Sequence, residues 1–241
     1  MNPTARIVDN AWKAGLLVPA FNIPYLPMVE PVIRAVVEED VFALLEVARA
    51  EWRKFGSRSM AAVHEEFHKH ADPAYVRLHL DHIPVIDEDG SRVDHLDIIR
   101  EAIELGFDSV MVDGSRLELE ENIRETGRVV EMAHAADIPC EAELGAVLGH
   151  EEGPLPPYEE LFSSGRGFTD PQQAARFVAE SGCDWLSVAF GNIHGRISQA
   201  ARDEQKVAAR LDIGHLERIR EAAGVPLVLH GGSGIQQRYV L

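Results

Sequence analysis

The sequence predicts an α/β protein in which helices cover both faces of a parallel sheet. Three observations predict it: seven short apolar runs recur along the 241 residues, segments with helical periodicity separate them, and no linker-like stretch interrupts the alternation near the middle. Such regular alternation favours a closed barrel of the TIM (β/α)8 type, formed as a single domain by residues 1–241. An open doubly wound sheet is the structural alternative.

The expected strands read LLVPAFNI, VFALLEVA, VRLHLDH, SVMVDGS, IPCEAELG, DWLSVAFG and VPLVLHGGSG. Nearly continuous apolar runs are typical of strands that are buried on both sides. Cys140 and Cys183 lie in such apolar contexts, without the spacing of zinc ligands or of a disulfide framework. We therefore expect both to be buried free thiols.

The chain ends at Leu241, shortly after the seventh run. The sequence therefore predicts a C-terminally incomplete barrel that lacks the eighth strand and helix. Because seven strands leave two unpaired edges, we expect a fragment of a longer protein, with a partner that fills the gap as the alternative.

Two of the expected helices have sequence signals that define where they begin and end. In residues 95–106, apolar side chains recur on one face and Gly106 takes the C-cap position. The stretch TDPQQAARFVAESG begins with Thr169 or Asp170 as its N-cap, continues with a proline and ends in glycine. EWRKFGSRSMAAVHEEFHKHADPAY is charged and predicts one helix, the second of the barrel. GHEEGPLPPYEELFSSGRG is rich in proline and glycine, which is typical of a mobile active-site loop.

Composition excludes several classes of partner. Lysine and arginine total 23 and aspartate and glutamate total 40, which gives a formal net charge of −17. This excess of negative charge repels nucleic acids and anionic membrane surfaces, so an anionic substrate needs a local binding site. No apolar run approaches the roughly 18 residues of a membrane span, and the N-terminus lacks the pattern of an export signal. We expect a cytoplasmic protein with no nucleic-acid or membrane partner.

Polar residues gather at the carboxyl ends of the expected strands. Because the loops after barrel strands converge on one face, these residues form a candidate active site. They are Asn22, Asp81, His82, Asp113, Glu141, Glu143, Asn192, His194, His230 and Ser233.

Three histidines of this set, His82, His194 and His230, follow three different strands at equivalent positions. Three imidazoles with an open fourth position are the ligands of many catalytic zinc sites. A single histidine is more often a structural residue, and this is our interpretation of His79, which lies earlier in its strand. The remaining histidines are expected to be mostly solvated: His64, His68, His70, His95, His134, His150 and His215.

The turn HGGSG offers backbone N–H groups and the Ser233 hydroxyl to an anion, and FGNIHG is built in the same way. Glycine-rich turns also simply terminate strands. Directly after a candidate metal ligand, however, the turn places an anion site beside a metal site.

In combination, VPAFNI, HLDH, GFDSVMVDGS, EAELG, FTDP, FGNIHG and VPLVLHGGSG resemble the class II, zinc-dependent fructose- and tagatose-bisphosphate aldolase family over essentially the whole chain. The resemblance implies a (β/α)8 barrel, a homodimer or homotetramer, and a carbon–carbon lyase. Its members cleave a ketose (bis)phosphate reversibly into a dihydroxyacetone-phosphate-type donor and an aldehyde, through a zinc-stabilised ene-diolate.

The resemblance also implies a role for each matching residue. His82, His194 and His230 would bind zinc, and Asp81 would exchange the proton of the substrate hydroxyl. Glu151 or Glu152 would be the acid/base of the loop. Asp113 and Glu143 would orient ligands or hold a second metal. The substrate or phosphate ligands would be Asn22, Gly195, Gly231, Gly232 and Ser233, with a monovalent cation nearby.

One departure from the family concerns the second strand. A Gln-x-Ser-like element is replaced here by Glu46-Val47-Ala48, with Arg49 next, and DHIPVIDEDG after His82 is acidic and long. The second phosphate of a bisphosphate is therefore either absent from the substrate or bound by Arg49.

Two other functions remain open from the residues alone. A zinc hydrolase would also use three histidines and a carboxylate, because the same donors activate water. A non-catalytic sugar-phosphate-binding relative would explain the changes at residues 46–48. No lysine stands at the strand ends, which argues against a Schiff-base mechanism.

Overall fold

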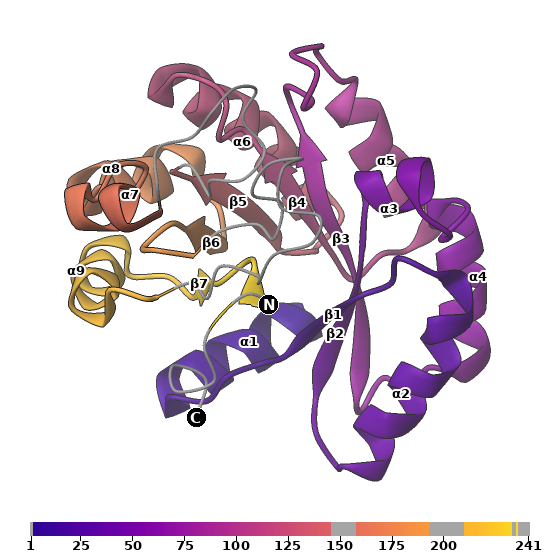
Figure 1. The fold of residues 1–241 in the computed structure, drawn as a ribbon. Coiled ribbons are helices and arrows are strands. Elements are labelled where there is room, and N and C mark those ends of the chain that lie inside the picture. The colour runs from indigo at the N-terminus through magenta and orange to yellow at the C-terminus, as the bar shows by residue number, and fades with distance from the viewer. Residues whose placement is uncertain (1, 146–157, 193–209, 233–234, 236–241) are drawn as a thin grey trace.

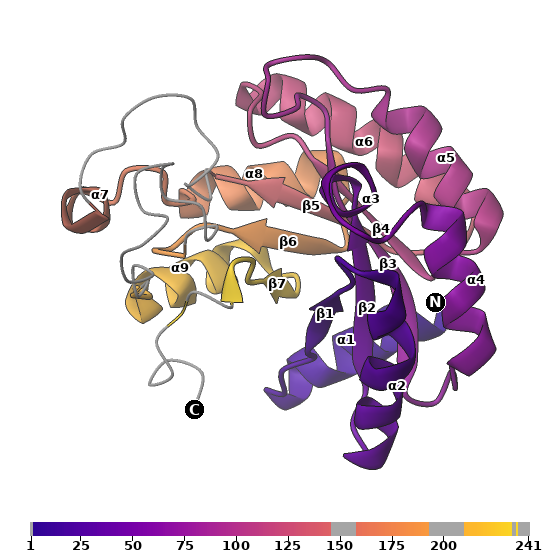
Figure 2. The ribbon, with the colours of Figure 1, turned by 45° about the vertical axis from the view of Figure 1, so that its right-hand side comes forward.

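The computed structural model describes residues 2–145, 158–192, 210–232 and 235. The chain forms one seven-stranded sheet in which the order of the strands, β1 to β7, is their order in the sequence. All six pairings are parallel. Figures 1 and 2 show the sheet curling into a half-barrel with most helices on its outer side. The α/β barrel prediction is confirmed, and the sequential strand order argues against the doubly wound alternative.

Each predicted apolar run contains one strand. The strands are β1 (Ala20–Asn22), β2 (Ala43–Ala48), β3 (Val76–Pro84), β4 (Ser109–Asp113), β5 (Cys140–Leu144), β6 (Trp185–Val188) and β7 (Leu227–Val228). The helices are α1 (Pro3–Ala14), the short 3₁₀ helix η1 (Leu26–Met28), α2 (Val29–Glu38), α3 (Arg49–Lys54), α4 (Met60–His70), α5 (His95–Leu105), α6 (Leu119–Ala135), α7 (Tyr158–Ser164), α8 (Pro171–Ser181) and α9 (Ile213–Ala223). None of the helices that the structure describes is long and apolar enough to cross a lipid bilayer.

The predicted helix ends are confirmed. Helix α5 ends at Gly106, whose φ of 96° is in the left-handed region. Of the two candidate N-caps of α8, Asp170 is the cap, because its side chain accepts hydrogen bonds from two backbone N–H groups of the first turn. The Thr169 hydroxyl instead donates to Leu144 O and accepts from the Ala189 N–H, which links the ends of β5 and β6.

The prediction of one helix after β2 is wrong. Helices α3 and α4 are separate, and Gly56, in the connection between them, forms a parallel bridge with Tyr25 in the segment that follows β1. Gly56 N–H donates to Pro24 O at 2.7 Å, and the buried Ser57 hydroxyl donates to Ile23 O. These bonds end α3, and Ser59 caps the start of α4. Within the expected active-site loop the structure describes α7, and residues 146–157 lie outside the described residues.

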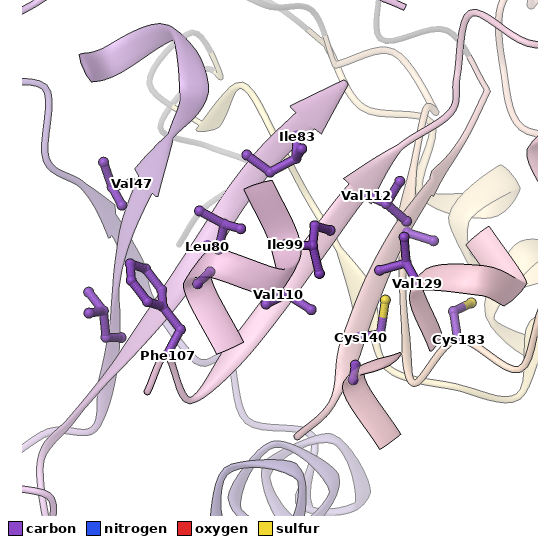
Figure 3. Packing of buried hydrophobic residues seen from close by; sticks show 14 of the residues in the cluster. Val47, Leu80, Ile83, Ile99, Phe107, Val110, Val112, Val129, Cys140 and Cys183 are labelled. Carbon is purple, nitrogen blue, oxygen red and sulfur yellow. The ribbon is translucent and has the colours of Figure 1, made fainter. Parts of the chain in front are cut away.

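The two faces of the strands differ in polarity. Apolar residues on the outer face, among them Val47, Leu80 and Val112, pack against the helices in one continuous core (Figure 3). Cys140 and Cys183 are buried there as free thiols, as predicted. The inner face carries buried polar residues instead, including Glu46, His79, Asp81, Ser109, Glu141, Glu143 and Ser187. The period of two along a strand produces this division.

In the part of the chain that the structure describes, β1 and β7 each pair on one side only. The single, C-terminally incomplete barrel domain stays a prediction.

Replacement of Gly145 by alanine should destabilise the fold. Gly145 has a φ of 97°, and an added Cβ would lie 2.5 Å from the Thr169 hydroxyl that links β5 to β6. We expect the left-handed backbone and the overlap together to cost about 2–4 kcal/mol of unfolding free energy, measured by urea denaturation. Gly224→Ala is the matched control, since Gly224 has a φ of 67° but a Cβ there would meet none of the described residues within 4 Å. It should cost about 1 kcal/mol, and an equal loss in both variants would contradict the role of Thr169.

Candidate metal centre at the carboxyl ends of the strands

Strand β3 contains a β-bulge at the two candidate catalytic residues. Between Leu80 and Ile83 the pairing of β3 with β4 shifts by one residue. Both of these apolar residues belong to the core under the helices, so the two residues between them, Asp81 and His82, both turn to the inner face. His82 adopts a φ of 36°, a left-handed conformation that is rare and strained for a residue with a side chain. The bulge therefore places an acid and an imidazole side by side.

The bulge meets the end of β7. His82 Nε2 lies 3.1 Å from His230 Nδ1. Asp81 Oδ1 lies 4.0 Å from both nitrogens, so the three atoms form a compact triangle. Two nitrogens that share a tetrahedral zinc ion at about 2.1 Å are separated by about 3.4 Å. The triangle has the dimensions and donor atoms of a metal site.

The other nitrogen of His82 faces a second group of carboxylates. His82 Nδ1 lies 3.6 Å from Asp113 Oδ2 and 3.5 Å from Glu143 Oε2, and these three residues form a second set of possible ligands. Asp113 ends β4 and Glu143 lies in β5. His82 is thus held between two acidic groups, one at each ring nitrogen.

A buried chain of polar side chains fixes the ring of His230. Its Nε2 lies 2.9 Å from Glu141 Oε1, and the other oxygen of Glu141 lies 3.5 Å from His79 Nε2. His79 Nδ1 in turn lies 2.8 Å from the Ser109 hydroxyl. Carboxylates that bind the outer nitrogen of a histidine commonly orient metal ligands. Glu141 therefore directs His230 Nδ1 toward Asp81 and His82.

Asn22 holds Asp81 from the other side, and Glu51 interacts with Asn22. The Asn22 side-chain amide donates to Asp81 Oδ2 at 2.8 Å. Glu51, which also interacts with Asn22, accepts a hydrogen bond from the Ala48 N–H at 2.8 Å and so closes the first turn of α3. The ends of β1, β2 and β3 are thereby tied together around one carboxylate.

Two buried carboxylate oxygens of the site could interact with a bound cation. Asp81 Oδ1 and Glu143 Oε2 have no hydrogen-bond partner among the described residues. Buried carboxylate oxygens are costly unless they are paired or bind a metal. Both oxygens border the ligand groups described above, and a bound divalent cation would satisfy them.

The pKa values describe a strongly negative pocket. Burial by itself raises the pKa of Asp81, but the His82 and His230 imidazoles outweigh burial and lower it below its usual value. Burial lowers the pKa of His82, yet Asp81, Asp113 and Glu143 raise it well above 6.5. Burial and then Asp113 raise the pKa of Glu143 to about 8. The pocket favours positive charge at its centre, either as a proton or as a metal ion.

The whole sequence matches one protein family. Residues 2–240 match the family described as fructose-bisphosphate aldolase class-II. The chain belongs to this family. It is a class II aldolase and hence a carbon–carbon lyase.

Relatives of known name agree with the family. The fructose-bisphosphate aldolase of Geobacillus stearothermophilus is 32% identical over 235 residues, which cover 95% of this chain and 72% of that protein. The fructose-bisphosphate aldolase of Streptococcus pneumoniae serotype 4 is 31% identical, with 98% and 72% covered. Among solved structures, the YdjI aldolase of Escherichia coli K12 superposes with a TM-score of 0.74 at 29% identity, over 99% of this chain and 76% of that one.

The structure brings together six of the predicted site residues of the class II aldolase. Those that meet at the inner face are Asn22, Asp81, His82, Asp113, Glu143 and His230. Five others lie outside the described residues: Glu151, Glu152, His194, Gly195 and Ser233. The roles of all of them stay predictions.

The turn after β7 is described in part. Gly231 has a φ of 75°. A Cβ built at Gly232 meets no atom of the described residues within 4 Å, so among these residues the backbone there is open to a ligand. Asn192 donates from its amide to Val188 O and to His230 O, each at 3.2 Å, and so joins the end of β6 to the candidate ligand of β7.

Arg49 has a partner within the chain. Its guanidinium pairs with the Asp87 carboxylate, which lies in the loop after β3. Both side chains are largely buried, with 12% and 21% of their surfaces exposed. Its predicted role as a phosphate ligand is considered below.

Sequence reasoning gave no role to three acidic residues of the site. Glu46, Glu51 and Glu141 are all buried. Glu141 is among the polar residues expected at the strand ends, and the period of two along the strand places it on the same face as Glu143. Glu51 gave no such signal, because it lies on α3 and reaches the site only through the fold.

Two expectations about the other histidines have clear outcomes. His79 is fully buried and hydrogen-bonded, as expected of a structural residue. His95, expected to be solvated, is buried with 4% of its surface exposed, because α6 covers it and Glu125 Oε2 lies 3.4 Å from its Nε2. His150 lies outside the described residues.

The charge of Glu51 should make the stability of the metal-free protein depend on pH. Burial raises the pKa of Glu51 from 4.5 to about 7. Between these two pH values the unfolded chain loses the proton first, so the contribution of Glu51 to stability falls as pH rises. Glu51→Gln keeps an acceptor for the Ala48 N–H but does not titrate. Its free energy of unfolding relative to wild type should therefore increase from pH 5 to pH 8 in urea denaturation of the metal-free protein.

Glu217→Gln is the control, because Glu217 is exposed on α9. This variant should show no such trend. A constant difference between Glu51→Gln and wild type across this range would show that Glu51 is ionised at pH 5 in the folded protein.

Proposed function

We propose that this chain cleaves and forms a ketose phosphate at a zinc ion bound by His82, His230 and His194. The products of cleavage are a dihydroxyacetone-phosphate-type donor and an aldehyde. The observation that supports the proposal is the triangle of Asp81 Oδ1, His82 Nε2 and His230 Nδ1 at the carboxyl ends of β3 and β7. Membership of the class II aldolase family supports the same reaction.

The residues of the site fit zinc. His82 presents Nε2 to the common centre, while its Nδ1 faces Asp113 and Glu143. His230 presents Nδ1, while Glu141 holds its Nε2. Each imidazole is thus oriented by carboxylates at the nitrogen that does not face the centre, as in many zinc sites. Bound zinc supplies Lewis acidity to the substrate carbonyl and stabilises negative charge that develops on the donor.

Asp81 is the base for the bond-breaking step. Its carboxylate takes the proton from the hydroxyl on the carbon that becomes the aldehyde. The carbon–oxygen double bond of the aldehyde then forms, the carbon–carbon bond breaks, and its electron pair stays on the donor. The Asn22 amide holds Asp81 Oδ2 and leaves Oδ1 facing the two imidazoles. Its lowered pKa keeps Asp81 ionised, which is the form that can accept a proton.

The other residues complete the assignment. Glu151 or Glu152 returns a proton to the donor carbon, and Asp113 and Glu143 orient His82. The donor phosphate binds to the turns that contain Gly195, Gly231, Gly232 and Ser233, with a monovalent cation nearby. The open backbone at Gly232 supports this part of the proposal.

A homodimer or homotetramer in the cytoplasm stays a prediction from the family resemblance and the sequence. Sedimentation equilibrium of the purified protein measures the oligomeric state. A zinc hydrolase is disfavoured by the family match, since all named relatives above are aldolases.

Removal of Asp81 should separate metal binding from catalysis. Asp81→Ala should retain zinc, because the imidazoles remain, but should lower turnover by about two to four orders of magnitude, since the proton acceptor is lost. A coupled triose-phosphate assay measures turnover, and atomic absorption measures zinc. His82→Ala and His194→Ala should lose the metal. Full zinc occupancy in either histidine variant would refute its assignment as a ligand.

Chelation should abolish activity. After dialysis against EDTA the protein should no longer cleave ketose phosphates in the coupled assay, and an equivalent of zinc should restore cleavage. Full activity of the metal-free protein would instead point to a Schiff-base lysine.

A further inference from the structure

The position of Asp81 defines where the aldehyde half of the substrate lies, if the proposed function holds. Asp81 exchanges a proton with the hydroxyl of the aldehyde half, so that half lies against its carboxylate. In the sheet, the residue directly opposite Asp81 on β2 is Ala48, and Arg49 follows it. The end of β2 and the start of α3 therefore border the aldehyde half, and the turn after β7 lies on the side of the donor.

This end of the site is rich in carboxylates. Glu46 and Glu51 are buried with 4% and 7% of their surfaces exposed, and Asp87 follows β3. A second phosphate on the aldehyde half would need a cation at this end of the site. Arg49 is a cationic side chain in this region, because it follows Ala48, the residue opposite Asp81.

The guanidinium of Arg49 is bound by the loop after β3. In this loop Ile86 pairs with Arg92 in an antiparallel bridge, and the resulting turn presents Asp87 to Arg49. A second ion pair, between Lys54 and Glu88 at 2.6 Å, ties the other end of α3 to the same turn. The pKa of Asp87 is lowered, because its hydrogen bonds from the Glu88 N–H and Arg49 outweigh its burial, so Asp87 carries its charge at neutral pH. The charge of Arg49 is therefore already neutralised within the protein.

We propose that the aldehyde half of the substrate carries no phosphate, so that the class of substrate is a ketose 1-phosphate with a neutral polyhydroxylated tail. Asp87 determines this specificity, because it occupies the guanidinium that would bind a second phosphate. A phosphate placed here would face Asp81 and Asp87 and would have to break a largely buried ion pair. Neutral hydroxyl groups, in contrast, can form hydrogen bonds with the carboxyl groups of Glu46 and Glu51.

Condensation with a constant donor tests the choice of aldehyde. The zinc-loaded protein is supplied with dihydroxyacetone phosphate and either glyceraldehyde or glyceraldehyde 3-phosphate, and kcat/KM for each aldehyde is measured from consumption of the donor. Wild type should prefer glyceraldehyde by about tenfold or more. A preference for glyceraldehyde 3-phosphate that disappears in Arg49→Gln would overturn the inference and make Arg49 the phosphate ligand.

Asp87→Asn should shift the ratio toward the phosphorylated aldehyde by about tenfold or more, because Arg49 becomes available. Glu88→Gln is the matched control, since it removes the same charge from the neighbouring residue, and it should leave the ratio unchanged. The double variant Asp87→Asn/Arg49→Gln should lose the gain. An equal shift in Asp87→Asn and Glu88→Gln would show a general effect of charge and would refute the specific role of Asp87.

The two proposals fail in different ways. Condensation that prefers the phosphorylated aldehyde contradicts the inference about the tail but supports the aldolase. Absence of condensation with either aldehyde in zinc-loaded protein, with circular dichroism showing the native fold, would refute the proposed function and the inference with it.

Discussion

The extra residue in β3 is the constraint on which the rest of the site depends. A regular strand sends neighbouring side chains to opposite faces of the sheet, so either Asp81 or His82 would lie under the helices. The bulge keeps Leu80 and Ile83 in the apolar core and turns both residues between them inward. The contacts of the His82 ring on both of its sides hold the strained backbone in place. Proton exchange and metal binding can therefore occur at adjacent positions of one strand.

The curl of the sheet supplies the remaining parts of the centre. It brings His230 to His82 although they are 148 residues apart in the sequence. The inner face carries carboxylates on four neighbouring strands, β2 to β5, and burying so many acids is unfavourable unless positive charge compensates them. The histidines converge at the same place, and the negative pocket there favours a bound cation. A metal ion bound there would couple stability to metal binding through one cluster of charges.

Under the proposed function, specificity resides in the connections after the strands. The break between α3 and α4 leaves α3 as a short helix whose two ends are tied to the loop after β3 by ion pairs. These ion pairs fix the loop after β3 against α3, which begins directly after the residue opposite Asp81. In this proposal the strands position the reacting groups, and the loop after β3 limits which substituents can lie next to them.

The sequence by itself determined the alternation of strands and helices, the ends of α5 and α8, and the strand ends at which Asp81, His82 and His230 gather. These follow from local patterns: apolar periodicity, capping residues, and the rule that parallel strands present their carboxyl ends together. Only the tertiary structure decided the bulge of β3, the break at Gly56, the burial of His95, and the pairing of Arg49 with Asp87. Each of these depends on a contact between segments that are distant in the chain, such as the Gly56 N–H with Pro24 O, and no local pattern encodes such a contact.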